Sequence, residues 1–237
     1  MECHLFLSGQ EPDPPTGNFL LDRLLDAKIH STSSRAERHP AMEVFASRLR
    51  NEGHRPYVIP VGGANAIGAY GYVLGFEELE GQVRGLPKKP TILIFASSSG
   101  TTYAGLLIGK LQIKSEVQIV GIRTDLDPNP ENVICGIANA LVERLGIQER
   151  VRREEVHLNR DYVGEEFRVP TKEGIDALRL LWRLEGILLE PVYTGKGMAG
   201  LIDLARKGLG KTERVVFLHT GGVPATFSFP EILSQSV

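Results

Sequence analysis

Residues 91–105 read TILIFASSSGTTYAG. The stretch opens with an uncharged apolar run rich in β-branched residues, which is typical of a buried strand in a parallel sheet. Small residues follow from Ser97 to Gly100, and a helix-like pattern begins near Thr102. A strand that enters a helix through such a turn directs unpaired backbone N–H groups and the helix dipole at one place. The stretch therefore predicts a βα unit that seats an anion such as a phosphate.

This turn carries more hydroxyl groups than a helix start requires. Ser99, Thr101 and Thr102 can add donors, and Gly100 lets the backbone approach a phosphate closely. The alternative is an ordinary βα turn with a Ser or Thr N-cap, for which one hydroxyl is enough. Neither the Walker pattern nor GxGxxG occurs here, which disfavours nucleoside triphosphates and dinucleotides as ligands.

Composition narrows the class of protein. The chain has 237 residues, 42% hydrophobic and 24% charged, so it can bury a sizeable core in one domain or two. A formal net charge of −2 gives no sign of nucleic-acid binding. Cys3 and Cys135 form no CxxC pair, and no histidines have a metal-ligand spacing such as HExxH. We therefore expect neither a disulfide scaffold nor a metal site.

Residues 56–76 carry no charge over a length that could cross a bilayer. Five glycines, two prolines and Asn65 interrupt this stretch, so we expect a strand, a turn and a helix in place of a membrane span. The first residues lack the basic segment and the long apolar core of a secretory signal. The expected location is therefore the cytoplasm.

Strand and helix patterns alternate along the chain. Strands are expected at 4–7, 28–30, 57–61, 91–96, 117–122 and 214–219, and helices at 18–27, 41–51, 65–82, 102–112, 130–145, 171–185 and 197–207. Such alternation predicts an α/β protein with a mostly parallel sheet covered by helices, whose ligands bind at the carboxyl ends of the strands.

Three glycines share one face of the helix expected at 65–82, namely Gly68, Gly71 and Gly75. Each costs a helix about 1 kcal/mol relative to alanine, so some neighbouring group should approach that face to compensate. We expect close packing at Gly71 and Gly75.

Two further loops follow apolar runs. Thr220, Gly221 and Gly222 come after the strand expected at 214–219, and Tyr193, Thr194 and Lys196 lead into the helix expected at 197–207. A common turn, a helix N-cap and a solvated lysine are the simpler interpretations of these residues.

Several segments together carry a family resemblance. In chain order they are VGGANAIGAYGYV, ASSSGTTYAGL, DYVGEEFRVPT, LEGILLEPVYTGKGMAGLIDL and FLHTGGVPATF. Their order and spacing resemble the later part of the D-cysteine desulfhydrase and 1-aminocyclopropane-1-carboxylate deaminase family. The resemblance covers nearly the whole chain, and agreement across independent motifs is more specific than any single one.

The resemblance implies a pyridoxal 5′-phosphate enzyme of the tryptophan synthase β-like fold (fold type II), an α/β architecture of three layers with a parallel sheet. Residues 1–62 would be the remainder of a small α/β domain, and residues 63–237 the large cofactor-binding domain. It also implies a small amino acid as substrate and a homodimer.

Site residues follow from the same resemblance. The cofactor phosphate would be held by Ser99, Gly100, Thr101 and Thr102, the pyridine ring would lie near Thr194, Thr220 and Gly221, and Tyr193 would lie near the substrate as an acid or base. Neutral hydroxyls beside the ring nitrogen would leave it less protonated than a carboxylate would. The deaminase branch has a glutamate where this chain has Thr194, so the resemblance favours β-elimination of the desulfhydrase kind.

The chain departs from the family at its amino terminus. It contains neither the GGNK-like motif of the Schiff-base lysine nor the QSNH-like segment that binds the substrate carboxylate, and it resembles a member without its leading segment. Lys196 is not the counterpart of that lysine. A catalytically inactive homologue that binds pyridoxal phosphate, or another phosphorylated metabolite, without a covalent bond is therefore the alternative. A flavodoxin-like or sugar-phosphate-binding protein is a third, which the HTGG and PVYTGK motifs disfavour.

Overall fold

The computed structural model describes residues 1–237 except 167, 212–213, 231 and 233–237. The chain forms two compact units, Met1–Pro60 with Pro224–Val237, and Val61–Val223. The division into domains after residue 62 stays a prediction from the sequence. The residues after 223 are grouped with the first unit and not with the second, and one reason is a hydrogen bond from Thr16 Oγ1 to the Phe227 carbonyl (2.7 Å).

The first unit contains a two-stranded parallel sheet, β1 (His4–Ser8) and β2 (Lys28–Thr32), with helices α1 (Gly17–Leu24) and α2 (Arg38–Asn51). Phe45 of α2 packs on three rings of this sheet, with centroid distances of 4.6 Å to His4, 4.8 Å to His30 and 5.7 Å to Phe6. This ring cluster joins α2 to the sheet.

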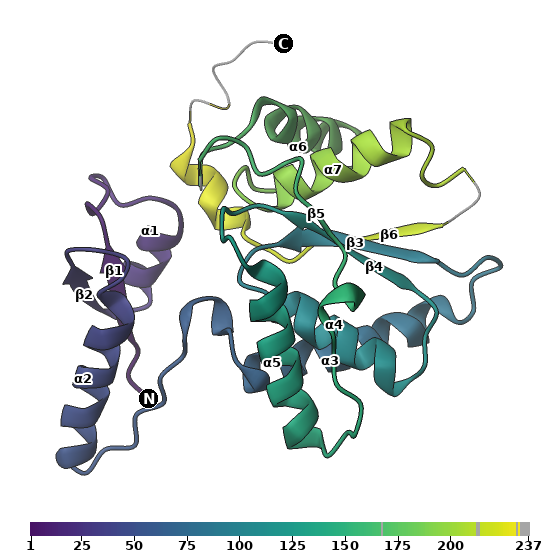
Figure 1. Ribbon diagram of the computed structural model, residues 1–237. Helices are drawn as coiled ribbons and strands as arrows, with labels where there is room; N and C mark the ends of the chain where they lie inside the picture. The colour runs from purple at the N-terminus through teal and green to yellow at the C-terminus, as the bar shows by residue number, and fades with distance from the viewer. Residues whose placement is uncertain (167, 212–213, 231, 233–237) are drawn as a thin grey trace. The chain divides into compact units, whose positions relative to one another are not determined.

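The second unit is built on a four-stranded parallel sheet in the order β5-β4-β3-β6 (Figure 1). Its strands are β3 (Ile92–Ser97), β4 (Gln118–Arg123), β5 (Leu158–Asn159) and β6 (Val215–Leu218). Three of these were expected from the sequence, whereas β5 is too short to give a periodic signal. Ser97 and Arg123 are register partners, so β3 and β4 end side by side.

Helices cover both faces of this sheet (Figure 1). One face carries α3 (Ala66–Val83), α4 (Thr101–Gln112) and α5 (Pro130–Leu145), and the other carries α6 (Lys172–Glu185) and α7 (Thr194–Arg206). Side chains of β3 alternate between the layers: Leu93 and Phe95 belong to the core with α3, α4 and α5, while Ile94 packs with Leu201 and Leu204 of α7. The expected three-layer α/β architecture is confirmed. Short 3-10 helices, η1 (Val61–Gly63), η2 (Arg153–Glu155) and η3 (Val223–Ser228), complete the elements.

The strand expected at 57–61 is wrong. Residues 54–60 have no regular structure, and η1 follows them. Pro56 and Pro60 have no N–H to donate to a ladder, and Tyr57 and Ile59 are more than half exposed. The apolar composition of residues 57–61 suggested a strand, but Pro56 and Pro60 prevent regular hydrogen bonding to a neighbouring strand. Within the described residues, no helix is both long enough and apolar enough to cross a membrane.

Close packing at Gly71 and Gly75 is also wrong. Among the described residues, no atom lies within 4 Å of where a Cβ would stand at either glycine. The tight contact of α3 is made on its other side by Gly105 of α4, where a Cβ would collide with the Ala69 carbonyl and would lie 2.6 Å from Tyr72 Cβ. Gly109 of α4 makes a similar contact, since a Cβ there would lie 2.8 Å from Phe76 Cβ, so the glycines that allow the approach belong to the partner helix.

Candidate active site

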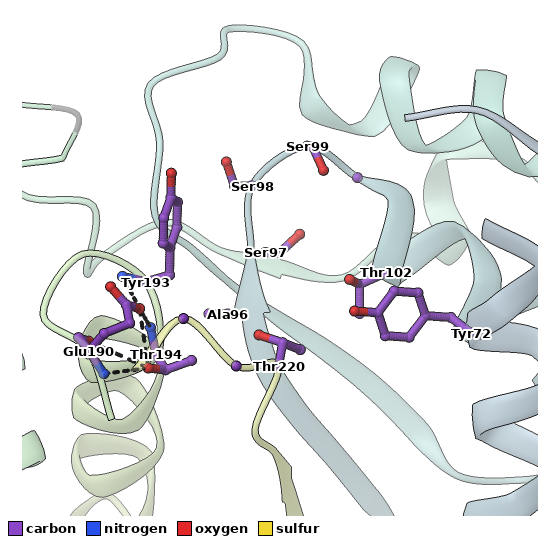
Figure 2. Close-up of a pocket in the computed structure, with 13 residues that line it drawn as sticks. Tyr72, Ala96, Ser97, Ser98, Ser99, Thr102, Glu190, Tyr193, Thr194 and Thr220 are labelled. Carbon is purple, nitrogen blue, oxygen red and sulfur yellow. Dashed lines mark hydrogen bonds between the residues drawn. The ribbon is translucent and has the colours of Figure 1, made fainter. Parts of the chain in front are cut away.

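A cavity of about 200 Å³ lies at the carboxyl ends of β3 and β6 (Figure 2). Its lining residues come from loops that are far apart in the sequence: Tyr72, Ala96, Ser97, Ser98, Ser99, Gly100, Thr102, Glu190, Tyr193, Thr194, Thr220, Gly221 and Gly222. This position agrees with the rule that ligands of parallel α/β sheets bind where the strands end.

The predicted site residues converge on this cavity with one exception. Those that line it are Ser99, Gly100, Thr102, Tyr193, Thr194, Thr220 and Gly221. Thr101 is buried, and its Oγ1 donates to the Gly62 carbonyl (2.9 Å), so its side chain ties the turn to η1 and does not line the cavity.

The amino terminus of α4 is open toward an anion. Its N-cap, Gly100, has φ +85° and no side-chain cap, and a Cβ there would lie 2.9 Å from Ile134 Cγ1. The Ser97 hydroxyl lines the cavity beside it, 2% exposed, and has no hydrogen-bond partner among the described residues. Unsatisfied buried hydroxyls are uncommon in proteins, so this one is available to bond a ligand atom. The residues present therefore fit a phosphate group.

The amino terminus of α7 is filled by a side chain of the protein itself. The Glu190 carboxylate is fully buried and accepts N–H bonds from Val192 (2.8 Å), Tyr193 (2.7 Å) and Thr194 (2.5 Å) (Figure 2). A negative charge at this end of a helix is stabilised by the dipole and by the charge-assisted bonds. This cap explains why α7 begins three residues before the start expected from the sequence.

Glu190 also joins the two loops that border this side of the cavity. Gly222 has φ +91°, and a Cβ on it would stand 2.7 Å from Glu190 Cγ. Thr194 Oγ1 accepts the Glu190 N–H (3.0 Å) and lies 3.2 Å from Glu190 Oε1. Glu190 is thus hydrogen-bonded to the Tyr193–Thr194 segment and lies close to Gly222 of the Thr-Gly-Gly turn.

Lys196 follows in the first turn of α7 and is fully buried outside the cavity lining. Its Nζ donates to the Val163 carbonyl (2.7 Å). Burial lowers the pKa of Lys196, and the negative charge of Glu190 partly opposes that shift. The amine is therefore engaged within the protein, away from the cavity residues.

The sequence did not point to Tyr72, Ala96 or Glu190 as site residues. Ser97, Ser98 and Gly222 lie in the turns that the sequence singled out, but no cofactor contact was predicted for them. Glu190 and Gly222 lie inside quoted motifs, and a signal for Glu190 was its place four residues before Thr194. That signal has meaning only once α7 is known to start there. Tyr72 reaches the cavity through the packing of α3 on α4, which no local pattern encodes.

Residues 1–221 match the pyridoxal-phosphate dependent enzyme family. The chain belongs to this family, whose cofactor is pyridoxal 5′-phosphate, and the expected fold type II architecture and cofactor are confirmed.

Among solved structures, the chain is similar to an ACC deaminase homologue, with 34% identity, a TM-score of 0.87, and coverage of 99% of this chain and 70% of that chain. A hydrogen sulfide-producing enzyme from Fusobacterium nucleatum matches at 14% identity and a TM-score of 0.58, covering 92% of this chain and 69% of that chain. A mutant of a hydrogen sulfide-producing enzyme matches at 16% identity and a TM-score of 0.66, covering 100% of this chain and 67% of that chain. The last two similarities establish the fold alone.

Proposed function

We propose that this protein performs pyridoxal-phosphate-dependent β-elimination or deamination of a small amino acid, releasing ammonia and a 2-oxo acid. The observation that carries the proposal is the convergence on one cavity of every predicted site residue except Thr101. Family membership supplies the cofactor, and the cavity supplies a seat for its phosphate beside groups suited to its ring.

In this proposal the start of α4 holds the phosphate, through backbone N–H groups and the hydroxyls of Ser97, Ser99 and Thr102. Thr220, with Thr194 nearby, would lie near the pyridine nitrogen, and these neutral hydroxyls would leave that nitrogen weakly protonated. When bound, the cofactor supplies an electron sink for the charge left when the amino acid loses its α-proton. Tyr193 holds or moves a proton at the substrate.

Two features favour the desulfhydrase type of reaction. Thr194 stands where the deaminase branch has a glutamate, and its hydroxyl is engaged by Glu190, which itself serves as the cap of α7. A carboxylate that accepts three N–H bonds has little acceptor capacity left for the ring nitrogen. We therefore place D-cysteine first among substrates and 1-aminocyclopropane-1-carboxylate second.

The test is an assay of the purified protein with pyridoxal phosphate and D-cysteine, L-cysteine or 1-aminocyclopropane-1-carboxylate. Sulfide, ammonia and pyruvate from D-cysteine are expected, and Tyr193→Phe should lower kcat by about 100-fold, in the usual range for loss of one acid–base group. Release of 2-oxobutanoate with no sulfide would reassign the protein to the deaminase type.

The second candidate function is cofactor binding without covalent chemistry. It is favoured by Lys196, which donates to Val163 and lies outside the cavity lining. Borohydride reduction of the protein with pyridoxal phosphate, followed by peptide mass analysis, separates the two. A reduced adduct on a lysine supports the enzyme, whereas tight binding without an adduct supports the non-covalent protein.

The cytoplasmic location and the homodimer stay predictions from the sequence. Sedimentation of the purified protein tests the second of these.

A further inference from the structure

A buried arginine lies behind the serine-rich turn. Arg123 is the last residue of β4 and is 1% exposed, and its register partner is Ser97 at the end of β3. Arg123 is not among the residues that line the cavity. Burying a guanidinium in a sheet core is costly unless its charge and its donors are satisfied, so its partners indicate what it does there.

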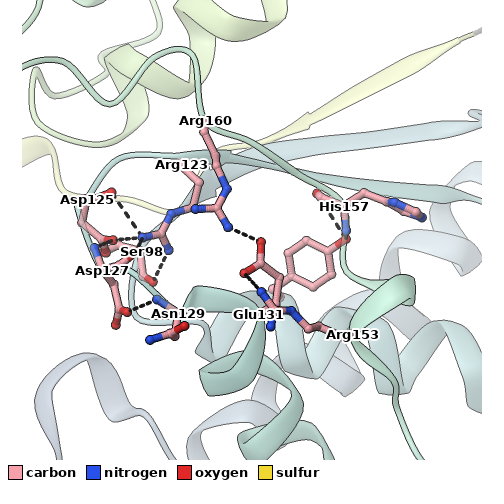
Figure 3. Close-up of polar contacts among 10 residues, drawn as sticks. Ser98, Arg123, Asp125, Asp127, Asn129, Glu131, Arg153, His157 and Arg160 are labelled. Carbon is pink, nitrogen blue, oxygen red and sulfur yellow. Dashed lines mark hydrogen bonds and ion pairs between the residues drawn. The ribbon is translucent and has the colours of Figure 1, made fainter.

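The partners of Arg123 all belong to two loops (Figure 3). Its guanidinium forms an ion pair with Asp125, whose side chain is 14% exposed, and donates to the carbonyls of Asp125 (3.2 Å) and Asp127 (3.3 Å). The remaining bond crosses to the other loop, where Nη1 donates to the Ser98 carbonyl (3.4 Å). Burial lowers the pKa of Arg123 while the two aspartates oppose the shift, and an arginine keeps its charge under these conditions.

Ser98 is therefore held at two points from one side. Its hydroxyl donates to Asp125 Oδ2, and its carbonyl accepts from Arg123. In a trans peptide the C=O and the following N–H lie in one plane and point in opposite directions. With the Ser98 carbonyl turned to Arg123, the N–H of Ser99 is turned away from Arg123.

We propose that the Arg123–Asp125 pair positions the Ser98–Ser99 peptide so that the Ser99 N–H faces the phosphate of the bound cofactor. The inference rests on the proposed function of the cavity and adds two positioning residues that never touch the ligand. Ser98 and Ser99 line the cavity and Arg123 does not, which fits an arginine that acts through the loop. The Arg123–Asp125 pair fixes the direction of a backbone donor in a turn of small residues. Less conformational entropy is then lost when the cofactor binds.

The experiment compares the affinities of the purified full chain for pyridoxal 5′-phosphate and for pyridoxal, which lacks the phosphate, by calorimetry. Arg123→Met should weaken pyridoxal phosphate binding about tenfold, equivalent to about 1.4 kcal/mol, and pyridoxal binding by less than about twofold. Ser98→Ala, which leaves the buried ion pair intact, should give the same selective loss at about fivefold. The control is Arg150→Met, because Arg150 is exposed and pairs with Glu143, so the two affinities of this variant should stay unchanged.

A purely structural role for Arg123 predicts equal losses for both ligands, and that result would overturn the inference. So would an unchanged affinity ratio in Ser98→Ala, which decides the matter if Arg123→Met does not fold. If the unmodified protein binds pyridoxal as tightly as pyridoxal phosphate, the proposed phosphate seat itself fails, and the positioning role fails with it.

Discussion

Two helix amino termini meet at the same cavity, and the protein treats them in opposite ways. At α7, a buried glutamate side chain accepts the N–H groups of Val192, Tyr193 and Thr194. At α4, the N-cap is a glycine without a side-chain cap, and the neighbouring Ser97 hydroxyl has no partner among the described residues. Both ends attract negative charge, and only one has it built in.

This difference supports the proposal that the anionic part of a ligand binds at α4. An anion at α7 would meet the Glu190 carboxylate, whereas an anion at α4 meets donors alone. The capped end offers no free N–H donors to an anion, because Val192, Tyr193 and Thr194 already donate to Glu190. The Glu190 carboxylate thus distinguishes the two helix starts at this cavity. It occupies the donors at the start of α7, whereas the start of α4 has no such side chain.

The largest effect on stability is expected from removing the Glu190 side chain at the start of α7. Glu190→Ala removes three charge-assisted hydrogen bonds from backbone groups that stay buried, so the free energy of unfolding should fall by about 3 kcal/mol. Urea denaturation followed by circular dichroism measures the change. Because the variant opens a second helix end to anions, added phosphate should stabilise it more than it stabilises the parent protein.

Glu190→Gln serves as the matched variant. It keeps the side-chain volume but brings an NH₂ group toward N–H donors, so it should destabilise the protein less than alanine without restoring the parent value. If both variants keep the parent stability, the carboxylate does not cap α7, and the contrast between the two ends is lost.

The second test changes the start of α4, where Gly100 is the N-cap. Gly100→Ala puts a Cβ at a positive φ and 2.9 Å from Ile134 Cγ1, which should cost about 2 kcal/mol of stability and move the turn. Binding of pyridoxal phosphate should weaken by at least about tenfold. Calorimetry and urea denaturation give the two numbers.

Gly146→Ala is the control for backbone strain. Gly146 caps α5 at φ +66°, and no described atom lies within 4 Å of the position of a Cβ. It should lose about 1 kcal/mol of stability and keep its cofactor affinity. Equal affinity losses in both variants would mean that Gly100 acts through general stability.

The open end could be read from the sequence, and the capped end could not. The strand, the turn and the helix at 91–112 are local in sequence, so composition and period predicted them within about a residue. The Glu190 cap depends on where α7 starts. The sequence pattern predicted a helix over 197–207 and therefore placed that start three residues too late. Likewise, the bond from Arg123 to Ser98 requires the register of β3 and β4, which is a tertiary property.

The third test uses the buried amine behind the capped end. Burial lowers the pKa of Lys196 from 10.5, so between its folded pKa and 10.5 the unfolded chain binds more protons than the folded chain. Stability from this group therefore rises with pH in that window, by at most about 1.4 kcal/mol per pH unit. The difference in unfolding free energy between the parent protein and Lys196→Met should grow as pH rises from neutrality toward 10.

Lys207, the C-cap residue of α7, provides a control of opposite sign. It is exposed and pairs with Asp203, which raises the pKa of Lys207. Its stabilising contribution is present below 10.5 and is lost as pH rises through the folded pKa. Lys207→Met should therefore show no growing deficit between neutrality and pH 10. A flat difference for Lys196→Met would mean that its amine is charged and solvated in the folded protein.

The variant with the smallest expected effect gives the most direct test of the difference between the two helix starts. Its unfolding free energy should rise while its affinity for the cofactor falls. Ser97→Ala removes a buried hydroxyl without a partner, so the protein without cofactor should gain about 1 kcal/mol in unfolding free energy. Its affinity for pyridoxal phosphate should fall about fivefold, because the lost hydroxyl is one that the ligand would satisfy. At the capped end, Thr194→Val removes a hydroxyl that is already bonded to Glu190, so that variant should lose stability. A loss of stability in Ser97→Ala would show that its hydroxyl is satisfied without a ligand, and that the start of α4 is no more open than the start of α7.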